Sequence, residues 1–177
     1  MAVDGGSVRD ATTADTEACL AVYTPYVLTS TVTFELEPPT TADFARRIVE
    51  AQAQHAWLVL EEGGVVIGYA YGGPFKARPA YRWACEVSVY LAEGHRGRGG
   101  GRALYTALLN RLAERGYRTV AAGMTQPNEA SAALHRSLGF STVGTFRRVG
   151  WKLGGWHDVT WVQRDLAARQ DPPAEPR

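Results

Sequence analysis

Two residues of the sequence have side chains suited to proton transfer and stand in apolar surroundings. Glu86 interrupts the apolar run 85–91, where burial raises the pKa of a carboxyl group and makes it a suitable general base near neutral pH. His135 lies about 100° around a helical pattern from the stripe formed by Leu134 and Leu138, and an unperturbed imidazole titrates at about pH 6.5. Each residue also has an ordinary structural interpretation, a polar position on a half-exposed strand or helix.

A segment rich in glycine and arginine, residues 95–102, follows the Glu86 strand and leads into a helical pattern at 103–113. Glycines that take positive φ let several N–H groups converge on an anion, and the amides at a helix N-terminus attract phosphate. The segment matches neither a P-loop nor the G-x-G-x-x-G of dinucleotide sites, so a phosphorylated ligand other than a nucleoside triphosphate or NAD is expected. The alternative is a flexible, solvated basic loop. The candidate residues are Arg96, Gly97, Arg98, Gly99, Gly100, Gly101 and Arg102.

Polar residues at two further places are candidates for ligand binding. Asn128 precedes a short helical pattern at 129–138 and is a typical helix N-cap, although a carboxamide there also suits a peptide-like amide of a ligand. Lys76, Arg78 and Tyr81 cluster shortly before the Glu86 strand. Cations beside a pocket suit an anionic substrate, and the alternative is again a solvated loop.

Cysteine and metal chemistry are both disfavoured. A nucleophilic Cys85 activated by His135 would need to share the pocket of Glu86, but neighbouring strand residues point to opposite faces. Cys85 and Cys19 are expected to be buried thiols. Residues 157–158, a histidine and an aspartate, have no second pair at ligand spacing. We therefore predict no metal and expect these two residues to hydrogen-bond locally.

Hydrophobic periodicity predicts a mixture of strands and helices around these residues. Strands are expected at 8–11, 57–61, 65–71, 81–91, 118–124, 143–148 and 156–163, and helices at 13–28, 40–54, 103–113 and 129–138. Residues 30–39 are expected to be an extended connection. Hairpins mixed with helical crossovers predict an α/β (α+β mixed) fold with helices on both faces of a mixed sheet. We expect one domain, 1–170, and a disordered proline-rich tail at 171–177.

The composition narrows the class of ligand. The chain has 177 residues, of which 45% are hydrophobic and 21% charged, enough for one domain with a core. A net charge of +1 argues against general binding to nucleic acid or to membrane surfaces, so the ligands should be small. The sequence has no apolar run of membrane-spanning length and no signal-peptide pattern near its first residue. We expect a soluble, cytoplasmic protein.

Taken together, the motifs resemble the GNAT superfamily of N-acetyltransferases. They are Glu86 in a strand, Arg96-x-x-Gly99-x-Gly101 before a helix, and Asn128 followed by Leu134-His135-x-x-Leu138-Gly139-Phe140. A narrower resemblance, to phosphinothricin acetyltransferases, is carried by the segments 30–34, 75–81 and 149–159. It extends over about residues 7 to 166, nearly the whole chain.

The resemblance implies a twisted, mostly antiparallel sheet of about seven strands that binds acetyl-CoA as cosubstrate. Backbone groups of Val87, Ser88 and Val89 would pair with the pantetheine and polarise the acetyl carbonyl, residues 96–102 would hold the phosphates, and Asn128 would contact the cofactor arm. Glu86 would remove the proton of the attacking amine, and backbone N–H groups would stabilise the oxyanion. Many GNAT enzymes have a tyrosine at the position of His135, so its role stays open between acid, second base and positioning group.

The resemblance also implies the acceptor and the assembly. Residues corresponding to Phe34, Lys76, Arg78 and Tyr81 lie near the amino-acid substrate in relatives, and Arg78 is the candidate for anion recognition. The expected reaction is acetylation of the α-amine of phosphinothricin, methionine sulfoximine or methionine sulfone by direct attack, in a homodimer. The alternatives are acetylation of another amine, such as a protein N-terminus or a polyamine, and a non-catalytic acetyl-CoA-binding module.

Overall fold

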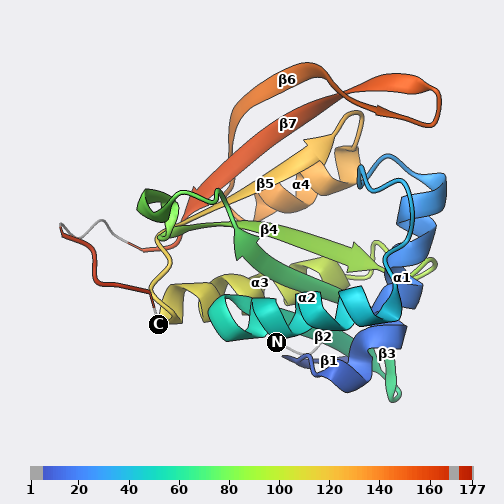
Figure 1. Ribbon diagram of the computed structural model, residues 1–177, viewed down its shortest axis with the longest axis horizontal. Coiled ribbons are helices and arrows are strands. Elements are labelled where there is room, and N and C mark those ends of the chain that lie inside the picture. The colour runs from blue at the N-terminus through green and yellow to red at the C-terminus, as the bar shows by residue number, and fades with distance from the viewer. Residues whose placement is uncertain (1–5, 168–171, 177) are drawn as a thin grey trace.

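A computed structural model describes residues 6–167 and 172–176, and it forms one seven-stranded sheet in the order β1-β2-β3-β4-β5-β7-β6 (Figure 1). The strands are β1 (Gly6–Asp10), β2 (Ala56–Glu62), β3 (Val65–Pro74), β4 (Ala84–Leu91), β5 (Thr119–Thr125), β6 (Ser141–Lys152) and β7 (Gly155–Asp165). The helices are α1 (Thr16–Thr29), α2 (Thr41–Gln54), α3 (Gly100–Glu114) and α4 (Glu129–Ser137). Every neighbouring pair of strands is antiparallel except β4 and β5. The predicted fold class is confirmed.

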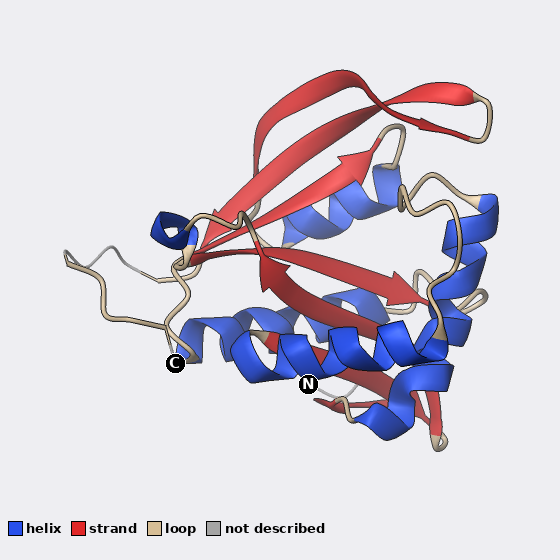
Figure 2. Cartoon of the chain, viewed as in Figure 1, coloured by secondary structure: helices blue, strands red, loops and turns tan. Residues whose placement is uncertain are grey.

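Helices cover both faces of the sheet (Figure 2), and the alternation of side chains along the strands explains why. In β2, Leu58 and Leu60 point into a cluster with α3, whereas Trp57 and Val59 point into a second cluster with α1 and α2. Successive side chains of a strand face opposite sides, so a strand buried on both sides reads as a continuous apolar run. Within the described ranges, no helix is long and apolar enough to cross a membrane.

The parallel pair β4–β5 is short and opens into a splay. Pairing runs from Ala84↔Thr119 to Glu86↔Ala121 and goes no further, although β4 continues to Leu91. β5 meanwhile pairs with β7 as far as Thr125. The two strands separate beyond Glu86 (Figure 1), and the backbone of residues 87–91 has no ladder partner on its β5 side.

The structure extends or shifts several predicted elements. The two short strands expected near the C-terminus are one long hairpin, β6–β7, whose register shifts between Thr142 and Gly144 and between Phe146 and Gly150. Such bulges interrupt the alternation from which strands are predicted. Residues 79–81 form a 3₁₀ helix, so β4 begins at Ala84 rather than at position 81. Helix α3 begins at Gly100, three residues earlier than expected.

The predicted disordered tail, 171–177, lies partly outside the described residues. Of the residues that are described, Ala174 accepts a hydrogen bond from Trp83 Nε1 through its carbonyl oxygen at 2.9 Å. Glu175 pairs with the guanidinium of Arg82 at 2.6 Å. Both contacts lie at the surface, and disorder of this tail stays a prediction.

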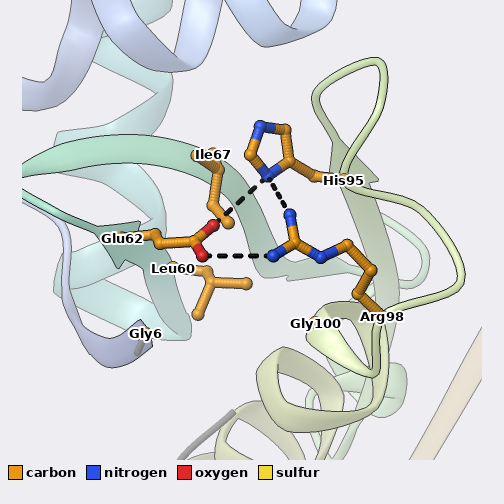
Figure 3. A pocket seen from close by; sticks show the side chains of 7 residues that line it. All are labelled: Gly6, Leu60, Glu62, Ile67, His95, Arg98 and Gly100. Carbon is orange, nitrogen blue, oxygen red and sulfur yellow. Dashed lines mark hydrogen bonds and ion pairs between the residues drawn. The ribbon is translucent and has the colours of Figure 1, made fainter. Parts of the chain in front are cut away.

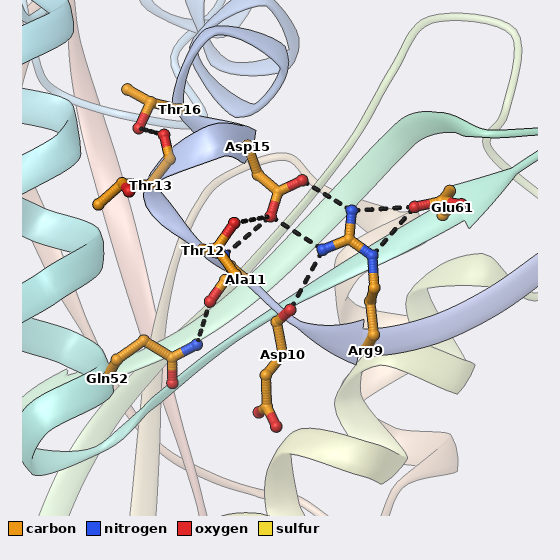
Figure 4. Close-up of polar contacts among 9 residues, drawn as sticks. All are labelled: Arg9, Asp10, Ala11, Thr12, Thr13, Asp15, Thr16, Gln52 and Glu61. Atoms are coloured by element: carbon orange, nitrogen blue, oxygen red, sulfur yellow. Dashed lines mark hydrogen bonds and ion pairs between the residues drawn. The ribbon is translucent and has the colours of Figure 1, made fainter.

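Arg9 of β1 joins three separate segments near the N-terminus (Figure 4). Its guanidinium donates to both oxygens of Asp15, at 2.9 and 2.7 Å, and to Glu61 at 3.0 Å. Asp15 also accepts from the backbone N–H of Thr12 at 2.8 Å. The bond from Arg9, more than any other contact, lowers the pKa of Asp15 from 3.8 to about 2. The charged form of Asp15 therefore stabilises the folded chain.

Asp15→Asn is expected to lower the free energy of unfolding by about 1–2 kcal/mol at pH 7. A carboxyl group whose pKa is lowered by folding stabilises the fold above pH 3.8, and this stabilisation is lost as the pH falls toward about 2. The difference in unfolding free energy between variant and parent should therefore shrink over that interval. The side chain of Arg9 is 40% exposed. Because solvent screens an exposed ion pair, we expect the loss of stability to lie at the lower end of this range. Urea unfolding at pH 7 and below pH 3 measures it.

Glu50→Gln is the matched control, because Glu50 pairs with Arg46 in a contact where both side chains are more than half exposed. Its loss should change stability little at either pH. A stability difference for Asp15→Asn that did not depend on pH would contradict the assigned cause.

Candidate active site

A cleft of about 670 Å³ lies where β4 and β5 separate beneath the β6–β7 hairpin. β4 contributes Glu86 and Ser88, β5 contributes Gly123, and the connection after α1 contributes Phe34. The structure thus brings Glu86 and Phe34, both predicted site residues, to one cavity. Residues 32–36, termed here the acceptor-side segment, form one wall of this cleft.

Glu86 has the properties of a general base. Burial is the main cause of a raised pKa for its carboxyl group, and the positive charge of Lys76 opposes the shift. Among the described residues no side chain donates a hydrogen bond to its carboxylate, which leaves the oxygens available to a ligand in the cleft. A carboxylate of this kind can accept a proton from a bound ammonium group near neutral pH.

The predicted substrate residues of the 75–81 loop do not all lie at the same site. Lys76 lines a cavity of about 440 Å³ that shares Phe146 and Trp161 with the main cleft, and its ammonium lies 5.8 Å from the Trp161 ring centroid. Arg78 and Tyr81 are exposed and line neither cavity. Their roles in substrate binding stay predictions.

His135 lies apart from Glu86. It lines a different, small cavity of about 140 Å³ and is only 3% exposed, whereas its neighbour Leu134 is partly exposed. The inward face of α4 is therefore rotated toward His135 relative to the predicted stripe. Burial lowers the pKa of the imidazole, which favours the neutral form.

The hydrogen bonds of His135 assign its tautomer. Nδ1 lies 2.7 Å from the carbonyl oxygen of Ser131 and must donate to it. In the neutral ring Nε2 is then an acceptor, and it faces the hydroxyl of Tyr105 at 3.2 Å. That hydroxyl also lies 3.4 Å from the carbonyl oxygen of Val87. Tyr105 thus connects His135 to the splayed part of β4.

Tyr105 was not predicted as a site residue, because a tyrosine beside leucines in a helical pattern fits the core equally well. The one available signal was its phenol group, which needs a hydrogen-bond partner when buried. Asn128 has the structural role expected of it, since its Oδ1 accepts from the backbone N–H of Ser131 at 3.1 Å and caps α4. Binding of a ligand amide by Asn128 stays a prediction.

The glycine-rich turn presents an uncapped helix N-terminus. Gly97 and Gly99 have φ of 75° and 86°, and Gly99 is the N-cap of α3 without a side-chain capping bond. A Cβ atom at either position would meet no other atom within 4 Å. Among the described residues, the backbone N–H groups of residues 97–101 have no acceptor, so they are available to a ligand, as an anion site requires.

The three arginines of this turn contact other parts of the protein. The guanidinium of Arg96 lies 4.9 Å from the Tyr26 ring centroid, and Arg102 donates to the Ser137 hydroxyl at 3.0 Å. Arg98 donates to Glu62 at 3.3 Å, and the two residues meet His95 in a pocket of about 270 Å³ behind the turn (Figure 3). Phosphate binding by these arginines stays a prediction. The feature of this turn that suits an anion in the structure is its set of backbone amides, unpaired within the described ranges.

The alternatives built on cysteine and on residues 157–158 are not supported. Cys85 is fully buried toward α3, and burial raises the pKa of its thiol to about 12, so it is no thiolate nucleophile. The expected local hydrogen bonds are confirmed: His157 Nε2 donates to the Lys152 carbonyl at 2.9 Å, and Asp158 accepts from the Arg148 N–H at 2.8 Å.

A half-buried carboxylate beside splayed parallel strands, with an uncapped helix N-terminus in the following turn, is the arrangement expected of an acyl-transferring enzyme of mixed α/β fold. A family model described as an acetyltransferase (GNAT) domain matches residues 8–161. The chain belongs to the GNAT family of acetyltransferases, as its motifs predicted.

Relatives of the chain include named enzymes. The phosphinothricin N-acetyltransferase of Streptomyces viridochromogenes is 43% identical over 170 residues, 96% of this chain and 91% of that protein. An L-methionine sulfoximine/L-methionine sulfone acetyltransferase of Pseudomonas aeruginosa is 34% identical over 172 residues, 94% of this chain and 98% of that protein. The crystal structure of a phosphinothricin acetyltransferase from Sinorhizobium meliloti in complex with AcCoA matches with a TM-score of 0.91 at 35% identity, over 98% of this chain and 94% of that one.

Proposed function

We propose that this acetyltransferase transfers the acetyl group of acetyl-CoA to the α-amine of a small amino acid such as phosphinothricin, methionine sulfoximine or methionine sulfone. The observation that carries the proposal is the position of Glu86, a carboxylate of raised pKa that lines the cleft at the point where β4 and β5 part. The acceptors are those in the names of its relatives. Residues 1–170 are proposed as the single domain that performs the reaction, supported by the match over 8–161.

The chain offers suitable groups to acetyl-CoA, which would supply an activated thioester. The backbone of residues 87–89 is free on its β5 side and suits the amides of a pantetheine arm. The amides around Gly99, open and uncapped, suit the pyrophosphate. The two features follow one another along the chain, so one extended ligand can contact both.

Glu86 takes the proton of the acceptor ammonium, directly or through a water molecule, because only the neutral amine is a nucleophile. The neutral amine attacks the acetyl carbonyl while both substrates are bound, so that a C–N bond forms, the C–S bond of the thioester breaks and CoA leaves as the thiolate, which takes the second amine proton. No covalent bond to the protein is required. His135 acts as a positioning group, supported by the use of both its ring nitrogens in hydrogen bonds within the protein. Tyr105, the hydrogen-bond partner of His135, carries a hydroxyl group that also lies 3.4 Å from the carbonyl oxygen of Val87 in β4.

The acceptor lies between Glu86 and the acceptor-side segment. Phe34 would contact its side chain, and the ammonium of Lys76, in the adjoining cavity, would attract an anionic group. Arg78 and Tyr81 are proposed to complete this site from the exposed loop.

A homodimer is proposed to cover the apolar surface of the β6–β7 hairpin. The large apolar side chains that are more than half exposed there are Val143, Phe146, Val149, Trp151, Leu153 and Trp156. An exposed patch of this kind is typical of an interaction surface. Light scattering in solution should give twice the mass of one chain, and a monomeric mass would overturn this assembly.

A thiol-release assay with acetyl-CoA tests the function. We expect release with at least one of phosphinothricin, methionine sulfoximine and methionine sulfone, at a kcat/KM about tenfold or more above that for spermidine or a peptide with a free N-terminus. A preference for the peptide or the polyamine would overturn the assigned acceptor. No release with any amine would overturn the enzymatic function.

A further inference from the structure

Lys152, the last residue of β6, is a buried lysine with an unusual set of partners. It is 3% exposed, and its Nζ donates to the carbonyl oxygen of Thr33 at 2.7 Å and to that of Tyr26 at 3.4 Å. Among the described residues no carboxylate lies within ion-pair distance of it. Burial lowers the pKa of the amine, against the attraction of Glu35. A buried amine is costly unless its donors are used, so this contact has a structural purpose.

The partners of Lys152 belong to α1 and to the acceptor-side segment. Tyr26 lies in the last turns of α1, where carbonyl oxygens lack partners within the helix and the helix dipole favours a cation. Its carbonyl oxygen also accepts from the Ser30 hydroxyl at 2.8 Å. Thr33 and the next residue, Phe34, both line the cleft with Glu86. One ammonium group therefore connects the hairpin to the helix and to the cleft wall.

Gly150, two residues earlier on the same strand, receives the ring of Phe34. A Cβ atom at Gly150 would overlap three carbon atoms of that ring. His157 on β7 lies with its ring centroid 6.3 Å from that of Phe34 and donates to the carbonyl of Lys152. The end of the hairpin thus holds both the backbone and the ring of the acceptor-side segment.

The other side of the segment is held independently. The hydroxyls of Thr33 and Tyr23 lie 2.7 Å apart, and Glu35 pairs with Arg47 of α2 at 2.6 Å. These contacts attach the segment to the helices, whereas Lys152 and Gly150 attach it to the hairpin. In the described sheet, β6 pairs with β7 alone, so the far end of the hairpin depends on such contacts for its position (Figure 1).

We propose that Lys152 is a positioning residue for acceptor binding: it fastens the end of the β6–β7 hairpin to residues 33–34 and so fixes the width of the cleft between Phe34 and Glu86. This inference rests on the proposed function, because it assigns the cleft to the acceptor. The glycine-rich turn around Gly99 does not line this cleft, so the amides assigned to the phosphates lie outside the region that Lys152 fastens.

Lys152→Met, which keeps an unbranched side chain of nearly the same length and removes its donors, tests the proposal. We expect the KM of the best amino-acid acceptor to rise about tenfold or more, because the loss of two buried hydrogen bonds is worth at least about a factor of ten in an equilibrium constant. The KM of acetyl-CoA should stay within about twofold and kcat within about threefold, because Glu86 and the glycine-rich turn are untouched. Lys152→Arg, which keeps charge and donors, should lie closer to the parent.

Hydrogen exchange gives a readout that does not depend on catalysis. In the Lys152→Met protein, amides of residues 30–36 and of the hairpin end should exchange faster, and those of α3 should not. If the parent acetylates no amine, the proposed function fails while this exchange result still decides whether Lys152 fastens the hairpin. Unchanged exchange, or equal changes in both substrate KM values, would overturn the inference.

Gly150→Ala keeps the test decisive if Lys152→Met does not fold. The added methyl group must displace Phe34, and the acceptor KM should again rise while that of acetyl-CoA does not. Gly155→Ala, at the other side of the same turn, is the control, because its methyl group would meet the His157 ring at an ordinary 3.7 Å. Equal effects of the two alanines would contradict a specific contact with Phe34.

Discussion

Glu86→Gln should lower kcat by about 10²- to 10⁴-fold, the contribution of a positioned general base, and leave acetyl-CoA affinity within about twofold. The amide keeps the shape of the carboxylate but cannot take the ammonium proton. Steady-state kinetics with thiol detection and titration of CoA measure the two quantities. A variant with the kcat of the parent would remove Glu86 from the reaction.

The pH profile gives this prediction a second, independent test. The base form of Glu86 exists above its raised pKa, so kcat/KM of the parent should climb as the pH passes that value, and this limb should be absent from Glu86→Gln. The same shift has an effect on stability. A carboxyl group whose pKa rises on folding stabilises the fold at low pH and loses that contribution as the pH rises, so the amide variant should be no less stable than the parent at pH 7.

Glu114→Gln is the matched control for this experiment. Glu114 lies at the end of α3 with a side chain 73% exposed, outside the cleft and outside the glycine-rich turn. It should leave kcat, both KM values and the pH profile unchanged. A similar loss of activity in this variant would point to a general effect of charge rather than to proton transfer.

Gly99→Val should weaken acetyl-CoA binding about tenfold to a hundredfold. At φ 86° a valine is strained by about 1–2 kcal/mol, and relief of that strain turns the neighbouring amides away from a common anion. The side chain would also occupy the open space next to the N-terminus of α3. Calorimetric titration with CoA measures the affinity, and kcat at saturating cosubstrate should change little.

Gly64→Val separates strain from binding. Gly64 lies in the β2–β3 turn with φ 81° and, like Gly99, has no atom within 4 Å of a built Cβ. Both variants should therefore lose similar stability in urea, but only Gly99→Val should lose affinity for CoA. Equal affinities would show that the turn does not bind the cosubstrate.

Much of the architecture was predictable because local patterns determine it. The continuous apolar runs of β2 and β4 follow from burial on both faces, and the spacing of Leu104, Leu108 and Leu112 follows from the face that α3 buries. Glu86 could be singled out for the same reason, since a carboxylate in such a run is exceptional. The motifs then connected these elements to a family.

The rest depends on contacts between distant segments. The full length of β6 could not be predicted from the sequence, because two register shifts break the alternation of its side chains. The separation of His135 from Glu86 reflects the sheet lying between α4 and the cleft that Glu86 lines, which no spacing along the chain encodes. Lys152 gives no signal at all, since a lysine near a turn is ordinarily exposed and only the fold shows that it is buried.

The short β4–β5 pairing has a consequence for catalysis. In the described sheet it is the one ladder that joins the antiparallel half β1–β4 to the half β5–β7, and Glu86↔Ala121 is its last rung. The proposed base therefore lies at the last paired position of β4, directly before the two strands separate. Its backbone is already ordered by folding, so little entropy remains to be lost when the carboxylate meets the amine. The change from paired to splayed strands thus gives the carboxylate of Glu86 a fixed backbone position at the edge of the cleft, which suits the role proposed for it.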